Sequence, residues 1–163
     1  MGNTATEIAA IERYKKADTK GKEMLEEIFS KELFVPKPPA NWWEKYKTFE
    51  DACKYKKHNP KTILPYTNPK NKRQEYLNAI CKLDIIAEAI QGDWIADFGN
   101  ANQYKYYAYF RWDEGAGFVF VATGYVYVNT RTGIGVRHCF ATAAQAEWFG
   151  RQFIELNRIA LMR

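Results

Sequence analysis

Apolar residues recur at every third or fourth position in several parts of the chain, which is the spacing of one helix face. The clearest run extends from Lys72 to Gln91, and Gly92 is placed to end it. The apolar positions along its face are Tyr76, Leu77, Ile80, Leu83, Ile86, Ala87 and Ile90. This wide apolar face predicts a helix that packs at the centre of the fold.

Two shorter helices are predicted near the start of the chain. Helical spacing of apolar residues covers 5–16 and returns after Asp18 and Thr19, either of which can cap the second helix. The charges on the outer faces of these helices roughly cancel. We therefore predict a helical hairpin within 1–34 that serves as scaffold.

Two capping boxes predict where further helices begin. Thr48 begins the sequence Thr-Phe-Glu-Asp, which predicts a short helix that ends near Lys57. Thr142 is followed three residues later by Gln145, which predicts the start of a C-terminal helix.

From 104 to 128 the side chains alternate at every second residue, which is the spacing of β-strands. A predicted turn at 113–117 separates two strands, and 118–123 is apolar on both faces, as expected of a central strand. A second turn at 129–133 precedes a third predicted strand at 134–140. We predict an α+β fold with N-terminal helices, an antiparallel meander of three or more strands, and a C-terminal helix packed on one face of the sheet.

A chain of 163 residues has the length of one domain. We predict a single domain over 1–163, consisting of the helical hairpin at 1–34, a loop-rich basic segment at 35–71, and a helix–sheet–helix core at 72–163.

Positive charge is concentrated between Glu44 and Arg73, where nine basic residues stand against three acidic ones, a local net charge of +6. Such a segment attracts phosphates, although a solvated face is the alternative interpretation. From residue 54 onward it contains the seven residues that we name the basic surface: Lys54, Lys56, Lys57, Lys61, Lys70, Lys72 and Arg73.

Ten of the 26 aromatic residues fall within 104–128. One side of the first strand carries four residues that we name the basic–aromatic set: Lys105, Tyr107, Tyr109 and Arg111. Aromatic rings stack on bases while neighbouring cations meet phosphates, so this set is the predicted ligand site, extended by Arg131 and Arg137. Two alternatives stay open: a contact with a protein or a second copy of the chain, or tyrosines buried in a core between helices.

Residues suited to catalysis are few. His58 and His138 are the only imidazoles, and no catalytic or phosphate-loop motif occurs. Three cysteines without a CxxC pair indicate neither a disulfide framework nor a zinc site. We predict a protein that is not an enzyme and that uses no metal and no cofactor.

The first residues lack the apolar core of a signal peptide, and no apolar run of ~18 residues is present that could span a membrane. These features predict a cytoplasmic protein with reduced thiols and no membrane partner.

Two further stretches are KLDIIAEAIQGDWIADFGNANQYKYYAYF and CFATAAQAEWFGRQFIELNR. They resemble an uncharacterised family of proteins carried by phages and prophages of gut anaerobes. The matching residues are Ile85, Ile86, Ala89, Trp94, Lys105, Tyr106, Tyr107, Tyr109, Phe110, Cys139, Phe140, Ala146, Glu147, Gly150 and Phe153. Ala108 stands where that family has proline, residues 1–34 fit its helical start loosely, and 35–70 is not closely similar.

The family has no known activity, so the resemblance implies a context. It implies nucleic-acid handling, a virion component, or a counter-defence protein that sequesters a host partner or a signalling nucleotide in the host cytoplasm. We predict a non-enzymatic accessory protein that binds single-stranded nucleic acid or a nucleotide through the basic–aromatic set. The alternative is a protein–protein interaction or virion structural module that uses the same aromatic face.

Overall fold

A computed structural model describes residues 4–34, 40–127 and 137–161. The chain divides into two compact units, Met1–Trp42 and Trp43–Arg163, which are described separately below. The single domain expected over 1–163 stays a prediction.

The N-terminal unit contains α1 (Ala5–Lys16), α2 (Thr19–Ile28) and the short 3-10 helix η1 (Lys31–Leu33). The sequence-based prediction of two helices is confirmed, and Asp18 is the residue that caps the second. Tyr14 joins the parts of this unit, because its ring stacks on Phe34 at 4.2 Å between centroids and its hydroxyl donates to Glu26.

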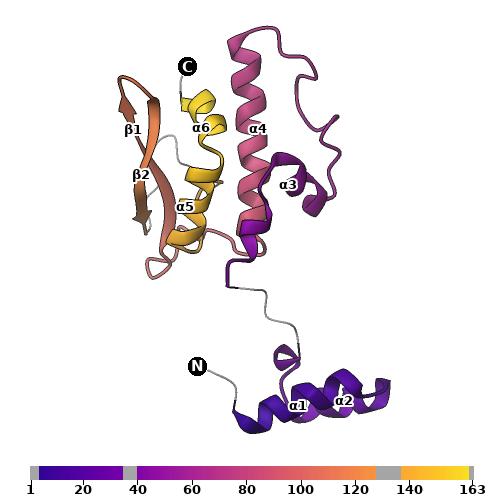
Figure 1. Ribbon diagram of the computed structural model, residues 1–163. Helices are drawn as coiled ribbons and strands as arrows, with labels where there is room; N and C mark the ends of the chain where they lie inside the picture. Colours follow the sequence, from indigo (N-terminus) through magenta and orange to yellow (C-terminus); the bar gives the residue numbers. More distant parts are fainter. Residues whose placement is uncertain (1–3, 35–39, 128–136, 162–163) are drawn as a thin grey trace. The chain divides into compact units, whose positions relative to one another are not determined.

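The C-terminal unit is built in layers around α4 (Lys72–Gln91), which the sequence predicted in full (Figure 1). The 3-10 helix η2 (Trp42–Lys45) leads to α3 (Phe49–Lys56), which packs on one side of α4. The other side of α4 contacts α5 (Ala143–Gln152) and α6 (Ile154–Leu161), and these two helices in turn carry the hairpin of β1 (Lys105–Asp113) and β2 (Gly117–Val126). The capping boxes at Thr48 and Thr142 are both formed.

The predicted meander of three or more strands is wrong, because the described residues form a two-stranded antiparallel sheet. Residues 134–136 of the expected third strand lie outside the described residues. Of the remainder, Phe140 alone pairs with β1, through two backbone hydrogen bonds to Tyr106. The preceding residues turn to α4 instead, since Gln91 donates its side-chain amide to the carbonyls of Arg137 and Cys139.

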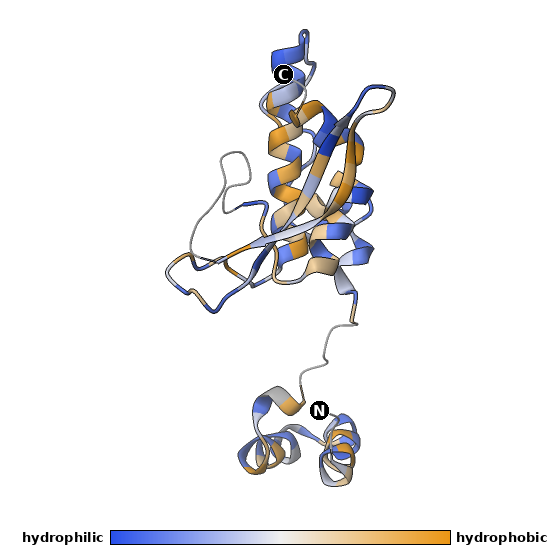
Figure 2. Cartoon of the chain, turned by 90° about the vertical axis from the view of Figure 1, so that its left-hand side faces the viewer, coloured by the Kyte–Doolittle hydropathy of each residue, from blue (hydrophilic) through white to orange (hydrophobic). Residues whose placement is uncertain are grey.

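The single C-terminal helix that the sequence predicts is divided into α5 and α6 at Phe153, whose backbone leaves the helical region. Both helices pack on the same side of the hairpin, as Figures 1 and 2 show. Gly150 permits this contact, because a Cβ there would lie 2.5 Å from the ring of Phe120 and 2.9 Å from the Cβ of Ala108.

The core of this unit is made by the inner faces of its helices. Leu83, Ile86 and Ile90 of α4 are buried, as are Phe140 and Phe149. Each fully buried aliphatic side chain contributes about 1.5–3 kcal/mol relative to an exposed one. The hairpin packs on α5 and α6, and β1 becomes more exposed toward the turn that joins it to β2.

Candidate functional site

The four residues of the basic–aromatic set do not share one exposed surface. Lys105 is fully buried, and its ammonium donates to the carbonyls of Asn100 and Gln103 at 3.1 and 2.8 Å. It also lies 5.2 Å from the centre of the Phe98 ring. These contacts replace the water that a buried charge loses, so Lys105 fastens the loop before β1 to the strand.

Tyr107 is also buried, and its ring lies across the opposite strand. It faces Gly124 in the register of the hairpin, where an added Cβ would come within 2.5 Å of the tyrosine Cζ. Tyr109 is 51% exposed and Arg111 is exposed as well. The set therefore leaves one aromatic and one cationic side chain facing solvent.

Arg131 lies outside the described residues, and Arg137 is held by α4. Its guanidinium donates to Oδ2 of Asp84 at 2.7 Å, while Nε2 of His138 lies 2.9 Å from Oδ1 of the same carboxylate. Burial raises the pKa of Asp84, but the bonds from His138 and Arg137 outweigh it and hold that pKa below its ordinary value. This cluster ties the segment after the hairpin to α4.

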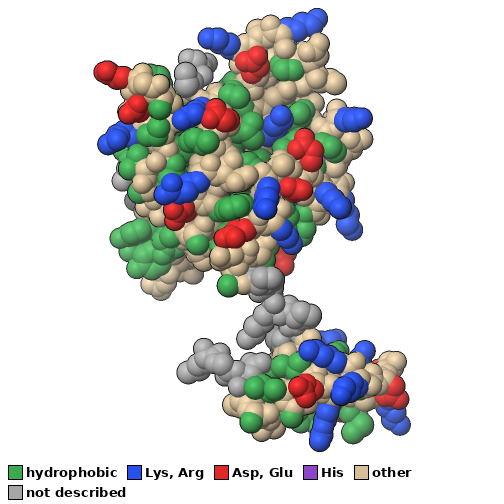
Figure 3. Space-filling view, in the orientation of Figure 1, with side chains coloured by type: hydrophobic (Ala, Val, Ile, Leu, Met, Phe, Trp, Pro, Cys, Tyr) green, Lys and Arg blue, Asp and Glu red, His purple; other side chains and the backbone are tan. Residues whose placement is uncertain are grey.

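Outside the basic–aromatic set, the hairpin exposes a second group of aromatic side chains. Four tyrosines, which we name the tyrosine cluster, gather on the helix-facing side of the hairpin at its open end: Tyr104, Tyr106, Tyr125 and Tyr127. Tyr104, Tyr125 and Tyr127 are 45%, 54% and 40% exposed. Figure 3 shows hydrophobic side chains gathered at this end of the hairpin.

The rings of the tyrosine cluster contact one another rather than a covering helix. The Tyr104 and Tyr127 centroids are 4.8 Å apart, and those of Tyr104 and Tyr125 are 5.3 Å apart. A hydrogen bond with Tyr104 raises the pKa of Tyr127 to about 12. The alternation of Tyr125 and Tyr127 opposite Tyr104 and Tyr106 is the sequence signal for this cluster.

The basic surface lies on α3, the following loop and the start of α4 (Figure 3). Within the described parts of the chain, Lys56 is its one member with an ion pair, to Glu88 at 3.2 Å. The other members are exposed, and no acidic residue occurs from 52 to 74. Their positive charge is therefore available to an anionic ligand.

A hollow adjoins the basic surface at η2 and α3. It has a volume of about 500 Å³ and is lined by Lys45, Tyr46, Asp51, Lys54 and Tyr55. Lys45 Nζ lies 4.9 Å from the centroid of the buried Tyr46 ring and 5.4 Å from that of the half-exposed Tyr55 ring. Burial raises the pKa of Tyr46, as do the charge and hydrogen bond of Tyr55. Aromatic rings and cations thus meet here, on α3 rather than on the sheet.

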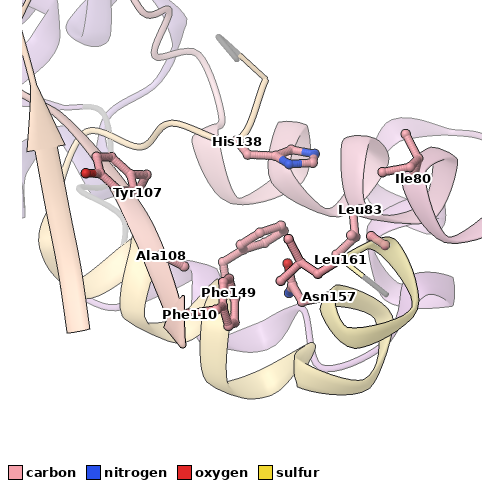
Figure 4. Close-up of a pocket in the computed structure, with 10 residues that line it drawn as sticks. Ile80, Leu83, Tyr107, Ala108, Phe110, His138, Phe149, Asn157 and Leu161 are labelled. Carbon is pink, nitrogen blue, oxygen red and sulfur yellow. The ribbon is translucent and has the colours of Figure 1, made fainter. Parts of the chain in front are cut away.

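A smaller cavity lies between α4, β1 and the C-terminal helices (Figure 4). Its volume is about 120 Å³, and Ile80, Phe110, Phe149 and Leu161 supply much of its apolar lining. Asn157 and His138 are polar residues at its wall. Pockets for drug-sized ligands measure about 300–1,000 Å³, so this cavity is too small for a nucleotide.

The structure also bears on metal and membrane sites. The part of the chain that the structure describes contains no cluster of three or more His, Cys, Asp or Glu residues able to hold a metal ion. Across the same residues, none of the helices is both long and apolar enough to cross a membrane.

The chain matches no known protein family, no curated protein and no solved structure.

Proposed function

We propose that the protein binds a phosphate-bearing ligand, single-stranded nucleic acid or a nucleotide, through the basic surface and the adjoining hollow. One observation carries this proposal: Lys54, which is exposed and makes no ion pair within the described residues, lines a hollow together with Lys45 and the half-exposed ring of Tyr55. Phosphates supply countercharge to the exposed Lys54, Lys57 and Arg73, and released counterions add to the affinity.

Tyr55 adds to the hollow an aromatic ring on which a base can stack. Stacking of a base on an aromatic ring contributes about 1–3 kcal/mol, and Tyr55 is 45% exposed beside Lys45 and Lys54. The hollow has a volume of about 500 Å³ and is widely open to solvent, so a ligand bound there is only partly enclosed. A polymer would continue from it along the basic surface. For a protein of a phage, this activity serves nucleic-acid handling or the sequestration of a host nucleotide.

Fluorescence anisotropy with a labelled single-stranded oligonucleotide, measured over a salt series, tests the proposal. Each phosphate contact on a single strand contributes about −0.7 to the slope of log K against log salt. We expect binding at low salt and a slope of about −3, which corresponds to roughly four contacts. Binding that is absent at low salt, or that does not change with salt, would contradict the polymer form. For the nucleotide form, we expect a mono-, di- or cyclic nucleotide to raise the melting temperature.

A second candidate function is contact with a protein through the hairpin. The observation that favours it is the tyrosine cluster, which holds three half-exposed rings in mutual contact away from the basic surface. Tyrosine is among the residues that dominate binding energy at protein interfaces. Such a contact needs no phosphate, so the two candidate functions use separate surfaces and can be tested separately.

A further inference from the structure

The outer edge of β2 has the features of a strand that pairs with another chain. One edge of β2 pairs with β1, and no described segment pairs with the other. From Gly117 to Val126 the strand contains no charged residue and no proline. Natural proteins protect exposed edges with lysine, proline, bulges or a covering element, because unpaired backbone groups recruit other strands.

Two of these protections are present at the first half of β2. A bulge opposite Tyr109 and Phe110 leaves Val121 as an extra residue in β2, and Arg158 of α6 donates from Nε to the Phe118 carbonyl at 2.8 Å. Neither reaches the second half of the strand. The segment 122–126 is therefore the part of the edge that can accept a partner strand.

The hairpin carries no net charge, because Asp113 and Glu114 balance Lys105 and Arg111, and this favours a partner of the same kind. Arg158 pairs with Glu155 at 2.6 Å, and Arg151 pairs with Glu147 at 2.7 Å. Two copies that meet along neutral strands bring no like charges into contact. Nucleic acid, by contrast, would find no unpaired cation on this strand.

We infer that the hairpin, as the protein-contact surface of the second candidate function, pairs through the 122–126 edge with the same edge of a second copy. The two strands run antiparallel about a two-fold axis. The neutral segment 122–126 of one copy then pairs with the same segment of the other copy, which is an isologous contact. The two hairpins then form one four-stranded sheet in the order β1, β2, β2, β1.

The tyrosine cluster adds area beside the paired edges. An aromatic side chain buries about 150–250 Å², so the exposed parts of Tyr104, Tyr125 and Tyr127 offer roughly 300 Å² per protomer. A standard interface buries about 800 Å² per partner. The rings thus provide more than a third of that area, and the paired backbone of 122–126 adds to it.

Light scattering coupled to size exclusion, over about a hundredfold range of concentration, tests this inference. We expect the wild type to reach twice the 19.0 kDa of the chain. Ala122→Lys adds a charge of the kind that protects natural edges, and it should raise the dimer dissociation constant at least roughly tenfold. Tyr109→Lys is the matched control, because Tyr109 faces Ala122 across the hairpin and lies on β1 away from the edge.

The outcomes separate the inference from the second candidate function. A dimer that is lost in Ala122→Lys and kept in Tyr109→Lys supports the inference, provided that circular dichroism shows both variants folded. Amide exchange that slows in β2 as concentration rises supports it without any variant. A wild type that stays monomeric overturns the second-copy inference alone. A dimer that survives both Ala122→Lys and Tyr104→Ala with Tyr125→Ala overturns the inference and the hairpin contact function together.

Discussion

The basic surface and the β1–β2 hairpin contain the same residue types, but the fold uses them in opposite ways. On the basic surface, Lys57 and Arg73 are exposed and make no ion pair within the described residues. On the hairpin, Lys105 is buried on two carbonyls, while tyrosines that a helix could have covered are exposed instead. One region thus offers charge and the other offers neutral aromatic area.

Residue type alone does not determine whether a side chain is available to a ligand. A lysine in a strand can be buried and hydrogen-bonded to the preceding loop when that loop covers it, as at Lys105. A lysine that no loop covers stays exposed, as at Lys57 after the end of α3. Burial and partner, which depend on the fold, decide which function each cation has.

The strongest perturbation of the hairpin should be a side chain at Gly150. We expect Gly150→Leu to lower the free energy of unfolding by about 3 kcal/mol, because overpacking forces Phe120 and Ala108 off α5. Urea denaturation measures this loss. Gly115→Ala in the turn is the control, since its Cβ would approach Asp113 only to 3.6 Å, and it should change stability by less than about 1 kcal/mol. Equal losses would contradict the packing described for α5.

The two lysine environments predict unequal stability effects. We expect Lys105→Ala to cost about 2 kcal/mol, because it leaves the Asn100 and Gln103 carbonyls without their donor and opens a void. Lys54→Ala should change stability by less than about 0.5 kcal/mol, as an exposed substitution does. Urea denaturation of the pair gives the answer directly. If the Lys105 variant is as stable as the Lys54 variant, the hydrogen bonds of the buried lysine do not stabilise the fold.

The carboxylate of Asp84 makes stability depend on acid. Its folded pKa lies below the ordinary 3.8, so its contribution is present above that value and is lost as pH falls through the folded pKa. We expect Asp84→Asn to cost about 1 kcal/mol at pH 7 and to match the wild type near pH 2. Denaturation at several pH values measures this convergence. A constant difference at every pH would assign the loss to packing rather than to charge.

The smallest expected effect lies in the tyrosine cluster. We expect Tyr104→Phe to lower the pKa of Tyr127 from about 12 toward 10.0, because the hydrogen bond between the two hydroxyls is the largest cause of the rise. Titration followed by NMR of the tyrosine ring carbons resolves the residue. Tyr109→Phe is the control and should leave Tyr127 unchanged.

Much of the helical structure follows from local signals that the sequence contains. The run from Lys72 to Gln91 and the capping boxes at Thr48 and Thr142 depend on neighbours within a few residues. Local signals could not show whether the predicted third strand forms. Its residues Arg137 and His138 bond to Asp84, more than fifty positions earlier, and only the folded chain brings them together.

The candidate site also depends on contacts between distant parts of the chain, which the sequence pattern does not reveal. Alternation along β1 correctly separates two faces, but it does not reveal that the loop containing Asn100 covers Lys105. The acid-free run that includes Lys54 and Lys57 was visible as charge and is exposed in the structure. Its aromatic component, Tyr55, lies within that run, and the hollow that adjoins it forms only when η2 and α3 come together.

One measurement tests directly whether ligand binding belongs to the basic surface: oligonucleotide anisotropy on two matched variants. The first neutralises Lys54, Lys57, Lys72 and Arg73 to Gln, and the second carries Tyr109→Ala with Arg111→Gln. We predict that the first loses affinity more than roughly tenfold at low salt, with a salt slope smaller by about 0.7 for each contact removed. The second should bind within about twofold of the wild type. If the hairpin variant loses affinity for the oligonucleotide while the basic-surface variant binds as the wild type does, the ligand site does not lie on the basic surface.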